Sequence, residues 1–381
     1  MMNRTRRLAT FSAIGLTAAL ALSACSAPTS EDGAGPTDEL TPIKLQLQWL
    51  PQGQFAGYFA AQEQGFFEEA GLDVEIIPSG GDIVPQDALA NGDVDYAIAW
   101  VPKVLGSIEA GANVTNIAQI FQRSGTLQVA WADSGIESVA DFEGKKIGSW
   151  GFGNEWEIFA AMAEEGLDSS TVEIITQDFN MNAFLSGDID AAQAMTYNEY
   201  AQVLESVNPD TGELYTPDDL NVISYEDTVG AMLQDAIWAD TERLETDTAY
   251  QETTVAFLKA VIKGWVFAAD NPEEASQITI DAGSGWGPSH ELWMVNETNK
   301  LIWPAPNGIG YIDTDAFAAT VAAALSAVNE TGASLITAEP PATAYTNEWI
   351  ERALAELAEE GVDTTGEGFS PIEVELMEGG N

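Results

Sequence analysis

The feature that most constrains this chain is a repeated alternation of strand and helix patterns. Residues 43–49 alternate apolar and polar side chains, as a half-buried strand does, and residues 53–65 carry aromatic and alanine residues at helical spacing. A second strand pattern at 73–77 completes a strand–helix–strand unit. Strands that alternate with helices in this way predict an α/β fold with a largely parallel sheet.

The same order of patterns returns later in the chain. A strand pattern at 146–150 is followed by glycines, a helix at 155–165 and a strand at 172–176. A helix end, a Gly-Asp turn and a strand also occur twice, at 88–97 and at 183–192. The repetition predicts a second α/β lobe of similar plan. Further helices are expected at 83–90, 248–269, 315–328 and 346–359, and further strands at 94–100 and 236–239.

The N-terminus has the pattern of an exported lipoprotein. Arginines within residues 4–7 precede an apolar run at 11–22 that is too short to remain as a membrane span. The chain's one cysteine, Cys25, directly follows a small residue, which resembles the bacterial lipobox. We therefore expect cleavage after residue 24, a lipid on Cys25, and a protein held at the outer face of the cell membrane.

The segment after Cys25 is predicted to be a flexible tether. Residues 26–40 are rich in Ser, Pro, Gly and acidic residues and contain no aromatic side chain, so they cannot bury enough apolar surface to fold. The predicted division of the chain is a signal peptide at 1–24, a lipidated tether at 25–41, a first lobe at 42–131 plus 236–381, and a second lobe at 132–235.

Composition excludes several classes of function. The formal net charge of −48 repels nucleic acid and anionic lipid. With a single histidine, His290, a multi-histidine metal site is excluded, and a Ser-His-Asp triad would have to use that residue. No GxSxG elbow, P-loop or HExxH motif is present. We therefore predict binding rather than catalysis, without a cofactor or a metal.

Several short phrases occur in order along the chain. They are Leu47-Gln48-Trp49 with Gly57–Ala61, Gly65–Leu72, Leu89–Asp95, Gly144–Gly148, and Ala256–Ala260 with Gly264-Trp265. Over about residues 42–327 they resemble type II solute-binding proteins of ABC importers, in the family that carries the thiamine pyrimidine precursor, riboflavin, alkanesulfonates and nitrate. The resemblance implies a type II periplasmic-binding-protein fold, in which two doubly wound α/β lobes joined by two crossover strands close on a ligand, and an ABC permease as partner. We expect crossings near Trp131 and near Trp238, and a monomer.

Ligand candidates follow from where the predicted strands end. In open α/β sheets a ligand lies beyond the carboxyl ends of the strands. Four aromatic residues selected by this rule could stack on a flat ring, or could instead pack the core or the hinge. They are Trp49, Trp100, Trp150 and Tyr197, and Tyr58 on the following helix is a further candidate of a kind more often found in a core.

Polar candidates surround the same strand ends. Gln48, Asn154 and Asn198 offer both donors and acceptors, whereas Glu155 and Glu199 offer only acceptors when ionised. Asn154 with the glutamate three residues later also predicts a helix N-cap with a capping box. A carboxylate at Glu155, in the first turn of that helix, opposes the binding of a small anion there.

This set of residues favours a flat, nitrogen-rich ring over a small oxyanion. The phrase Tyr197-Asn198-Glu199 also resembles the thiamine-precursor branch, so a thiamine-related pyrimidine or riboflavin is the expected ligand. An alkanesulfonate, taurine or nitrate carrier is the alternative, with Arg123 as its usable basic residue beside Gln122 and Ser124. A second alternative is a pyrimidine-synthesising enzyme of the same fold that consumes its own histidine. That function needs a histidine in the first lobe and a cysteine cluster, and we expect neither in this chain.

Overall fold

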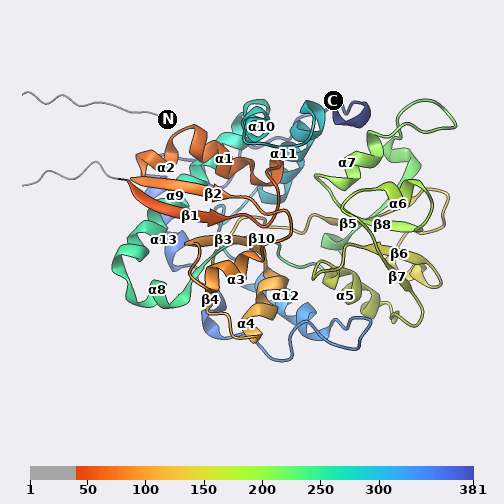
Figure 1. The fold of residues 1–381 in the computed structure, drawn as a ribbon, viewed down its shortest axis with the longest axis horizontal. Coiled ribbons are helices and arrows are strands. Elements are labelled where there is room, and N and C mark those ends of the chain that lie inside the picture. Colours follow the sequence, from red (N-terminus) through yellow and green to blue (C-terminus); the bar gives the residue numbers. More distant parts are fainter. Residues whose placement is uncertain (1–39) are drawn as a thin grey trace, which may run out of the picture. The chain divides into compact units, whose positions relative to one another are not determined.

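Two five-stranded sheets organise residues 40–381, the part of the chain that the computed structural model describes (Figure 1). The first sheet has the strand order β2-β1-β3-β10-β4, and the second has the order β7-β6-β8-β5-β9. The strands are β1 (Thr41–Gln46), β2 (Leu72–Ile77), β3 (Tyr96–Trp100), β4 (Val114–Gln119), β5 (Thr126–Trp131), β6 (Lys146–Ser149), β7 (Glu173–Thr176), β8 (Ala191–Met195), β9 (Leu220–Ser224) and β10 (Asp235–Asp240).

In each sheet, the first strand after a crossing from the other sheet runs antiparallel to its neighbours. β1 pairs in parallel with β2 and β3, whereas β10 lies antiparallel between β3 and β4. Likewise β6 pairs in parallel with β7 and β8, and β5 lies antiparallel between β8 and β9. The carboxyl ends of β1 and β3 therefore meet at one edge of the first sheet, and those of β6 and β8 meet at one edge of the second.

Helices cover both faces of each sheet, as expected for an α/β fold. On the first sheet, α1, α2, α9, α10 and α13 share a core on one face, and α3, α4 and α12 share a core on the other. On the second sheet, α5 packs on one face and α6 and α7 on the other. The helices are α1 (Ala56–Glu63), α2 (Phe66–Glu69), α3 (Pro85–Ala90), α4 (Val101–Glu109), α5 (Trp156–Glu164), α6 (Asn182–Leu185), α7 (Glu199–Leu204), α8 (Thr241–Thr246), α9 (Thr248–Asp270), α10 (Pro272–Asp281), α11 (Pro288–Ile302), α12 (Thr314–Ser326) and α13 (Glu348–Glu359).

The long helix α9 forms the centre of the first core. Its Phe257 stacks on Tyr96 of β3, with the ring centroids 4.3 Å apart. At Gly264 it packs directly on the backbone of α1, because a β-carbon there would lie 2.8 Å from the amide nitrogen of Ala61. Helix α9 thereby holds the first sheet and α1 together.

The predicted crossings need correction. Since β5 belongs to the second sheet, the chain leaves the first sheet between β4 and β5, at residues 120–125, and not after Trp131. It returns at 225–234, before β10, which contains Trp238 and pairs wholly within the first sheet. Below, "second lobe" means residues 126–224, and "first lobe" means the elements built on the first sheet.

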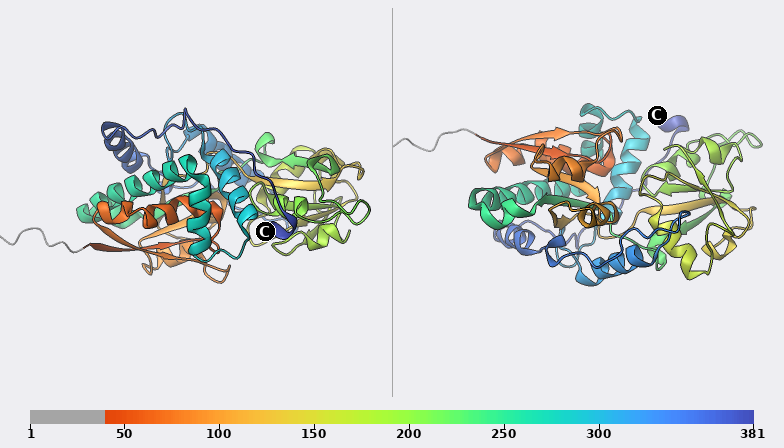
Figure 2. Two further views of the ribbon diagram at one scale, coloured as in Figure 1. Left: turned by 90° about the horizontal axis from the view of Figure 1, so that it is seen from above. Right: turned by 60° about the horizontal axis from the view of Figure 1, so that its bottom comes forward.

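The C-terminal segment, drawn in dark blue, reaches the second lobe (Figure 2). The Met377 amide donates a hydrogen bond to Ser289 Oγ of α11 at 3.2 Å, and the Gly379 amide donates to the Glu205 carbonyl, directly after α7, at 3.1 Å. This segment therefore contacts both lobes where α11 and α7 approach each other.

The predictions for the N-terminus, including the signal peptide and the lipid on Cys25, fall outside the described residues. Within residues 40–381, no helix combines the length and the hydrophobicity that a membrane crossing requires.

Candidate functional site

A cavity of about 700 Å³ lies between the two lobes. Its walls come from the strand ends and following turns of both sheets, as expected for a ligand site in an open α/β fold. The first lobe contributes Gln48, Trp49, Gln52, Gln54, residues 80–81 and 83–86, Ala99, Trp100, Lys103 and Leu335; the second contributes Trp150, Phe152, Gly153, Asn154, Phe179, Met195, Tyr197, Asn198 and Glu199.

Aromatic side chains from both lobes meet across this cavity. Trp49 follows β1, and its ring centroid lies 4.7 Å from that of Phe179, which follows β7. Phe179 is also stacked at 6.0 Å with Trp150, which follows β6. Phe152 is 85% exposed and has a positive φ of 55°, which is uncommon for a residue with a side chain. The cavity is thus bordered by apolar rings, two of which, Phe152 and Phe179, are exposed to solvent.

The end of β8 supplies the acidic part of the site. Glu199 begins α7, and its carboxylate accepts hydrogen bonds from the Met195 amide at 3.0 Å and from the Asn198 side-chain amide at 3.2 Å. Burial raises the pKa of Glu199 to about 7. A carboxylate has about four acceptor positions, so these bonds leave capacity for a ligand N–H group.

Behind the first-lobe wall lies a buried carboxyl group, Asp235, at the start of β10. It accepts a hydrogen bond from the Trp100 indole at 2.7 Å, which orients the ring. Burial raises the pKa of Asp235 to about 7, and the hydrogen bond from Trp100 opposes that rise. Asp235 therefore positions one cavity residue, Trp100, at the end of β3.

One cationic side chain, Lys103 of α4, lines the cavity. Its ammonium lies 5.4 Å from the ring centroid of Trp100, within the range of a cation–π contact. Burial lowers the pKa of Lys103 to about 8, against the opposing influence of Asp235 and Glu155. The site therefore contains both a cation and carboxyl groups.

Eight of the ten ligand-binding candidates line the cavity, and Tyr58 and Glu155 do not. Tyr58 is buried on α1, where its ring lies edge-on to Trp265 of α9 at 5.7 Å. Its position is therefore that of a core residue. Glu155 turns back on its own loop and accepts a hydrogen bond from the Gly153 amide at 2.8 Å. Burial raises the pKa of Glu155.

The predicted capping box does not form. Helix α5 begins at Trp156, and the Asn154 amide donates to the Gly151 carbonyl at 2.8 Å instead of capping the helix. Glu157 points to the crossover segment, where it accepts hydrogen bonds from the Met232 amide at 3.0 Å and the Gln234 side chain at 3.2 Å. Hydrogen bonds from these distant residues thus replace the predicted bond from the Asn154 backbone amide.

Arg123 is not available for an anion in the cavity. Its guanidinium donates to the backbone carbonyls of Leu301 and Trp303, both at 3.3 Å, and of Pro304 at 2.7 Å. It therefore joins the first crossover segment to the end of α11, and Lys103 takes its place as the basic residue of the site.

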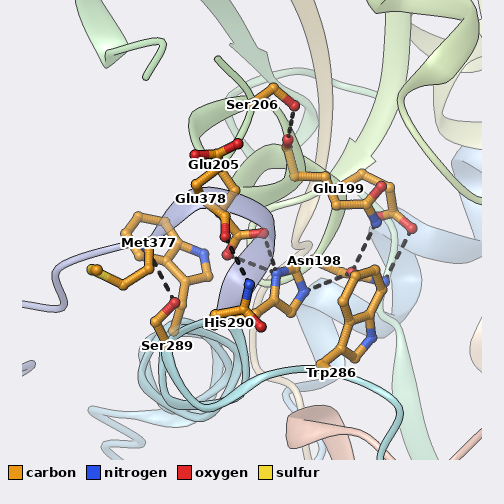
Figure 3. A network of polar contacts seen from close by, with 12 residues as sticks. Asn198, Glu199, Glu205, Ser206, Trp286, Ser289, His290, Met377 and Glu378 are labelled. Carbon is orange, nitrogen blue, oxygen red and sulfur yellow. Dashed lines mark hydrogen bonds and ion pairs between the residues drawn. The ribbon is translucent and has the colours of Figure 1, made fainter. Parts of the chain in front are cut away.

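Figure 3 shows His290 on α11 of the first lobe. It is not among the residues that line the cavity. Its ring is fully buried between Glu205 and Asn198. A histidine does therefore lie in the first lobe, contrary to expectation, but the chain's one cysteine is Cys25 and a cysteine cluster is absent from the sequence. No group of three potential metal ligands occurs among residues 40–381.

Two cavity residues that the sequence argument missed are Phe179 and Lys103. The strand-end rule, applied to the predicted strand at 172–176, would have pointed to Phe179. No comparable sequence pattern indicates Lys103, because its position on the side of α4 that faces the cavity depends on how that helix packs.

Known proteins resemble this chain over most of its described length. A formylaminopyrimidine-binding protein of Halalkalibacterium halodurans is 26% identical over 271 residues, which covers 70% of this chain and 76% of the relative. The riboflavin-binding protein RibY of Chloroflexus aurantiacus is 25% identical over 281 residues, with the same coverage of 70% and 76%.

Solved structures share the fold. The alkanesulfonate-binding protein SsuA of Xanthomonas axonopodis pv. citri superposes with a TM-score of 0.54 at 15% identity, over 75% of this chain and 92% of that one. This likeness supports the periplasmic-binding-protein fold. The family model described as "NMT1/THI5 like" matches residues 52–275, more than half of the chain. The chain therefore belongs to the NMT1/THI5-like family.

Proposed function

We propose that this protein is the substrate-binding component of an ABC importer and captures a flat nitrogen heterocycle between its lobes. A thiamine pyrimidine precursor or riboflavin is the proposed cargo, and an ABC permease is the proposed partner. The observation that carries the proposal is the cavity, in which aromatic rings from both lobes accompany side-chain amides, the carboxyl group of Glu199 and one lysine. The names of the relatives from H. halodurans and C. aurantiacus point to the same class of ligand.

The cavity has the dimensions and the surface for such a ligand. Its volume of about 700 Å³ lies within the usual range for small-molecule sites. Trp49 and Trp150 offer ring faces from opposite lobes, and offset stacking on a flat ring contributes roughly 0.5–1.5 kcal/mol per pair beyond area burial. Glu199 can accept an amino or ring N–H, and Gln48 can donate to a ring nitrogen or carbonyl.

Closure of the lobes would enclose the ligand. The contact between Trp49 and Phe179 links the first lobe to the second over the cavity. The two crossover segments, at 120–125 and 225–234, are the proposed hinges. They are coupled through Gln234, whose side chain accepts a hydrogen bond from the Gly125 amide at 2.9 Å and donates one to Ser124 Oγ at 3.2 Å. The proposed lobe boundaries therefore lie at these two segments.

Export and lipid anchoring complete the proposal and rest on the sequence alone. The basic start, the apolar run and Cys25 would place the mature protein at the outer face of the membrane. A chain held there by a lipid and a tether could deliver ligand to a permease in the same membrane. We assign no enzymatic step to it.

The test is ligand binding by the chain from Ser26 onward, followed by thermal shift and intrinsic tryptophan fluorescence. The panel contains formylaminopyrimidine, thiamine, riboflavin, taurine and nitrate. A rise in melting temperature with a ring compound is expected, because Trp49 and Trp150 stack on it. Glu199→Gln should weaken that binding about 10–100-fold, since a hydrogen bond to a charged group contributes about 1.5–3 kcal/mol. Glu213→Gln, an exposed residue of the second lobe, is the control. Absence of any shift with the ring compounds, in a folded protein, would refute the proposal.

Lys103 specifically favours a second candidate, an organic anion such as a sulfonate. Lys103→Gln should then weaken binding of taurine by about 10–100-fold, because a charge-assisted hydrogen bond is lost. For a neutral ring without an acceptor near Lys103, the same substitution should change affinity less than about 3-fold. Titration calorimetry with both ligand types distinguishes the two candidates, and an unchanged taurine affinity would remove the anion candidate.

A further inference from the structure

His290 lies where three segments of the chain meet. It is on α11 of the first lobe, it faces α7 and the preceding turn of the second lobe, and the C-terminal residues 377–380 cover it (Figure 3). A β-carbon at Gly380 would lie 2.9 Å from the β-carbon of His290, so the tail is in direct contact. The imidazole is fully buried, and its surroundings therefore determine which of its nitrogens carry protons.

Both ring nitrogens of His290 face hydrogen-bond acceptors. Nδ1 lies 2.9 Å from each carboxylate oxygen of Glu205, and Nε2 lies 3.0 Å from the side-chain oxygen of Asn198. A neutral imidazole has one N–H donor and one acceptor nitrogen, whereas an imidazolium has two donors. When Glu205 is ionised, only the imidazolium satisfies both contacts.

The orientation of the Asn198 amide is defined by its other neighbours. Gln202 donates to the Asn198 oxygen at 3.1 Å, and the Asn198 nitrogen donates to Glu199 at 3.2 Å. A flipped amide would turn its oxygen toward the Glu199 carboxylate, which is unfavourable when that group is ionised. The chain of bonds therefore runs from Glu205 through His290 and Asn198 to Glu199.

We propose that His290 is an imidazolium that positions the ligand site across the lobe interface. It holds the Asn198 amide so that its N–H points to Glu199, and thereby sets the acceptor pattern offered to the ligand. Because His290 belongs to the first lobe and Asn198 to the second, this contact joins the two lobes. The consequence for ligand binding rests on the proposed function, whereas the protonation of the ring does not.

The surroundings of the ring fit a buried cation. Trp286 stacks on it with centroids 4.0 Å apart and an interplanar angle of 20°, which allows a cation–π contribution. The titratable groups on the elements around it are acidic. Glu205 faces the ring from the second lobe, and Glu199 lies beyond Asn198; Glu378 lies on the tail, and Glu291 is the next residue on α11. Glu291 is bonded to Ser284, so Glu205 is the direct partner.

Loss of the His290 proton should weaken ligand binding. Deprotonated Nε2 would present a lone pair to the Asn198 oxygen, and the contact between the lobes would become repulsive. Affinity should therefore fall on the alkaline side of its pH profile. The loss of affinity expected at acidic pH has a different cause, because a protonated Glu199 no longer offers a carboxylate acceptor to the ligand. Lys103 also titrates on the alkaline side, so the assignment requires a variant that leaves Lys103 intact.

The protonation of His290 can be observed directly, because it is the one histidine in the sequence. Protein carrying ¹⁵N-labelled histidine, produced without a histidine tag, gives the ring signals of a single residue. Two protonated ring nitrogens at neutral pH, without added ligand, are expected. A spectrum with one unprotonated, pyridine-type nitrogen would overturn the proposal. This result does not depend on which ligand the protein binds.

Variants then test the positioning role with formylaminopyrimidine as the probe. In Glu205→Gln the new amide can donate to Nδ1, so a neutral ring with a proton on Nε2 still bonds Asn198, and the alkaline loss of affinity should shrink at least 3-fold. Glu213→Gln removes one exposed charge from the same lobe and should keep the parental pH profile. His290→Gln should lose about 10-fold in affinity at neutral pH while its melting transition remains cooperative.

Two outcomes would overturn the positioning role. One is that Glu205→Gln loses as much affinity at alkaline pH as the parent protein does, and the other is that His290→Gln binds with parental affinity. If no compound of the panel binds, the proposed function fails, but the ¹⁵N spectrum of the labelled histidine still determines whether the His290 imidazole is charged. The failures of the two proposals are thus distinguishable.

Discussion

Replacing Gly264 with leucine should lower the free energy of unfolding by about 3 kcal/mol or more. A β-carbon at this position of α9 would overlap the carbonyl oxygen of Gly57 and would lie 2.8 Å from both the amide nitrogen and the β-carbon of Ala61. These are mainly backbone atoms of α1, so the helices would have to separate. Overpacking of a tight core typically costs about 1–3 kcal/mol, and displacement of a whole helix costs more.

The loss is large relative to the total stability of a domain, which is about 5–15 kcal/mol. Urea unfolding monitored by tryptophan fluorescence is the measurement. The matched control is Gly285→Leu, because a β-carbon at Gly285 would meet nothing within 4 Å and the residue is exposed. Equal midpoints for Gly264→Leu and the parent protein would show that α1 and α9 are not packed as described.

The protein should be less stable at pH 8 than at pH 5, by about 3 kcal/mol or more. Four buried carboxyl groups have their pKa raised to about 7 by burial: Glu157, Glu199, Asp235 and Glu291. Between their unfolded values, near 4, and about 7, the native state binds more protons than the unfolded chain does. Stability therefore falls as pH rises through this window. One pKa unit corresponds to about 1.4 kcal/mol for each group.

Exposed carboxyl groups do not reverse this direction. Hydrogen bonds lower the pKa of Asp141 and Asp168, but such groups change stability only at pH values near or below their ordinary pKa, outside the window from 5 to 8. The net charge of −48 acts in the same direction as the buried groups, through repulsion that salt screens. Unfolding should therefore be measured in 1 M NaCl.

A single substitution tests the origin of the pH dependence. Glu157→Gln should reduce the difference in unfolding free energy between pH 5 and pH 8 by on the order of 1–3 kcal/mol, because one buried proton no longer exchanges. Glu213→Gln, which is exposed, should leave the difference unchanged. A pH dependence that is the same in both variants, or that has the opposite sign in the parent, would contradict the explanation.

Several properties of the fold were predictable from local patterns. The helix expected at 248–269 is α9 (Thr248–Asp270), and the strand expected at 73–77 is β2 (Leu72–Ile77). Periodicity and glycine turns are local signals, so they locate elements without knowledge of the fold. The strand-end rule placed eight candidates at one cavity for the same reason. Their roles in ligand binding remain predictions.

The sheet to which a strand belongs could not be predicted in this way. Residues 126–131 have a strand pattern that would suit either sheet, and only the pairing of Gln128 with Gln193 and Ile223 assigns β5 to the second. Glu157 likewise matched a local capping motif, yet its partners, Met232 and Gln234, lie 75 or more positions away. Contacts between distant segments cannot be predicted from the local sequence pattern.

The sequence by itself determined the α/β class, the positions of most of the predicted strands and helices and the strand ends that line the cavity, because these depend on residues close together in the chain. Only the tertiary structure decided the crossings at 120–125 and 225–234, the use of Lys103 instead of Arg123, and the bonds of His290 to Glu205 and Asn198. Each of those depends on which surfaces pack together, and a buried charge takes whichever partner that packing brings within hydrogen-bond distance.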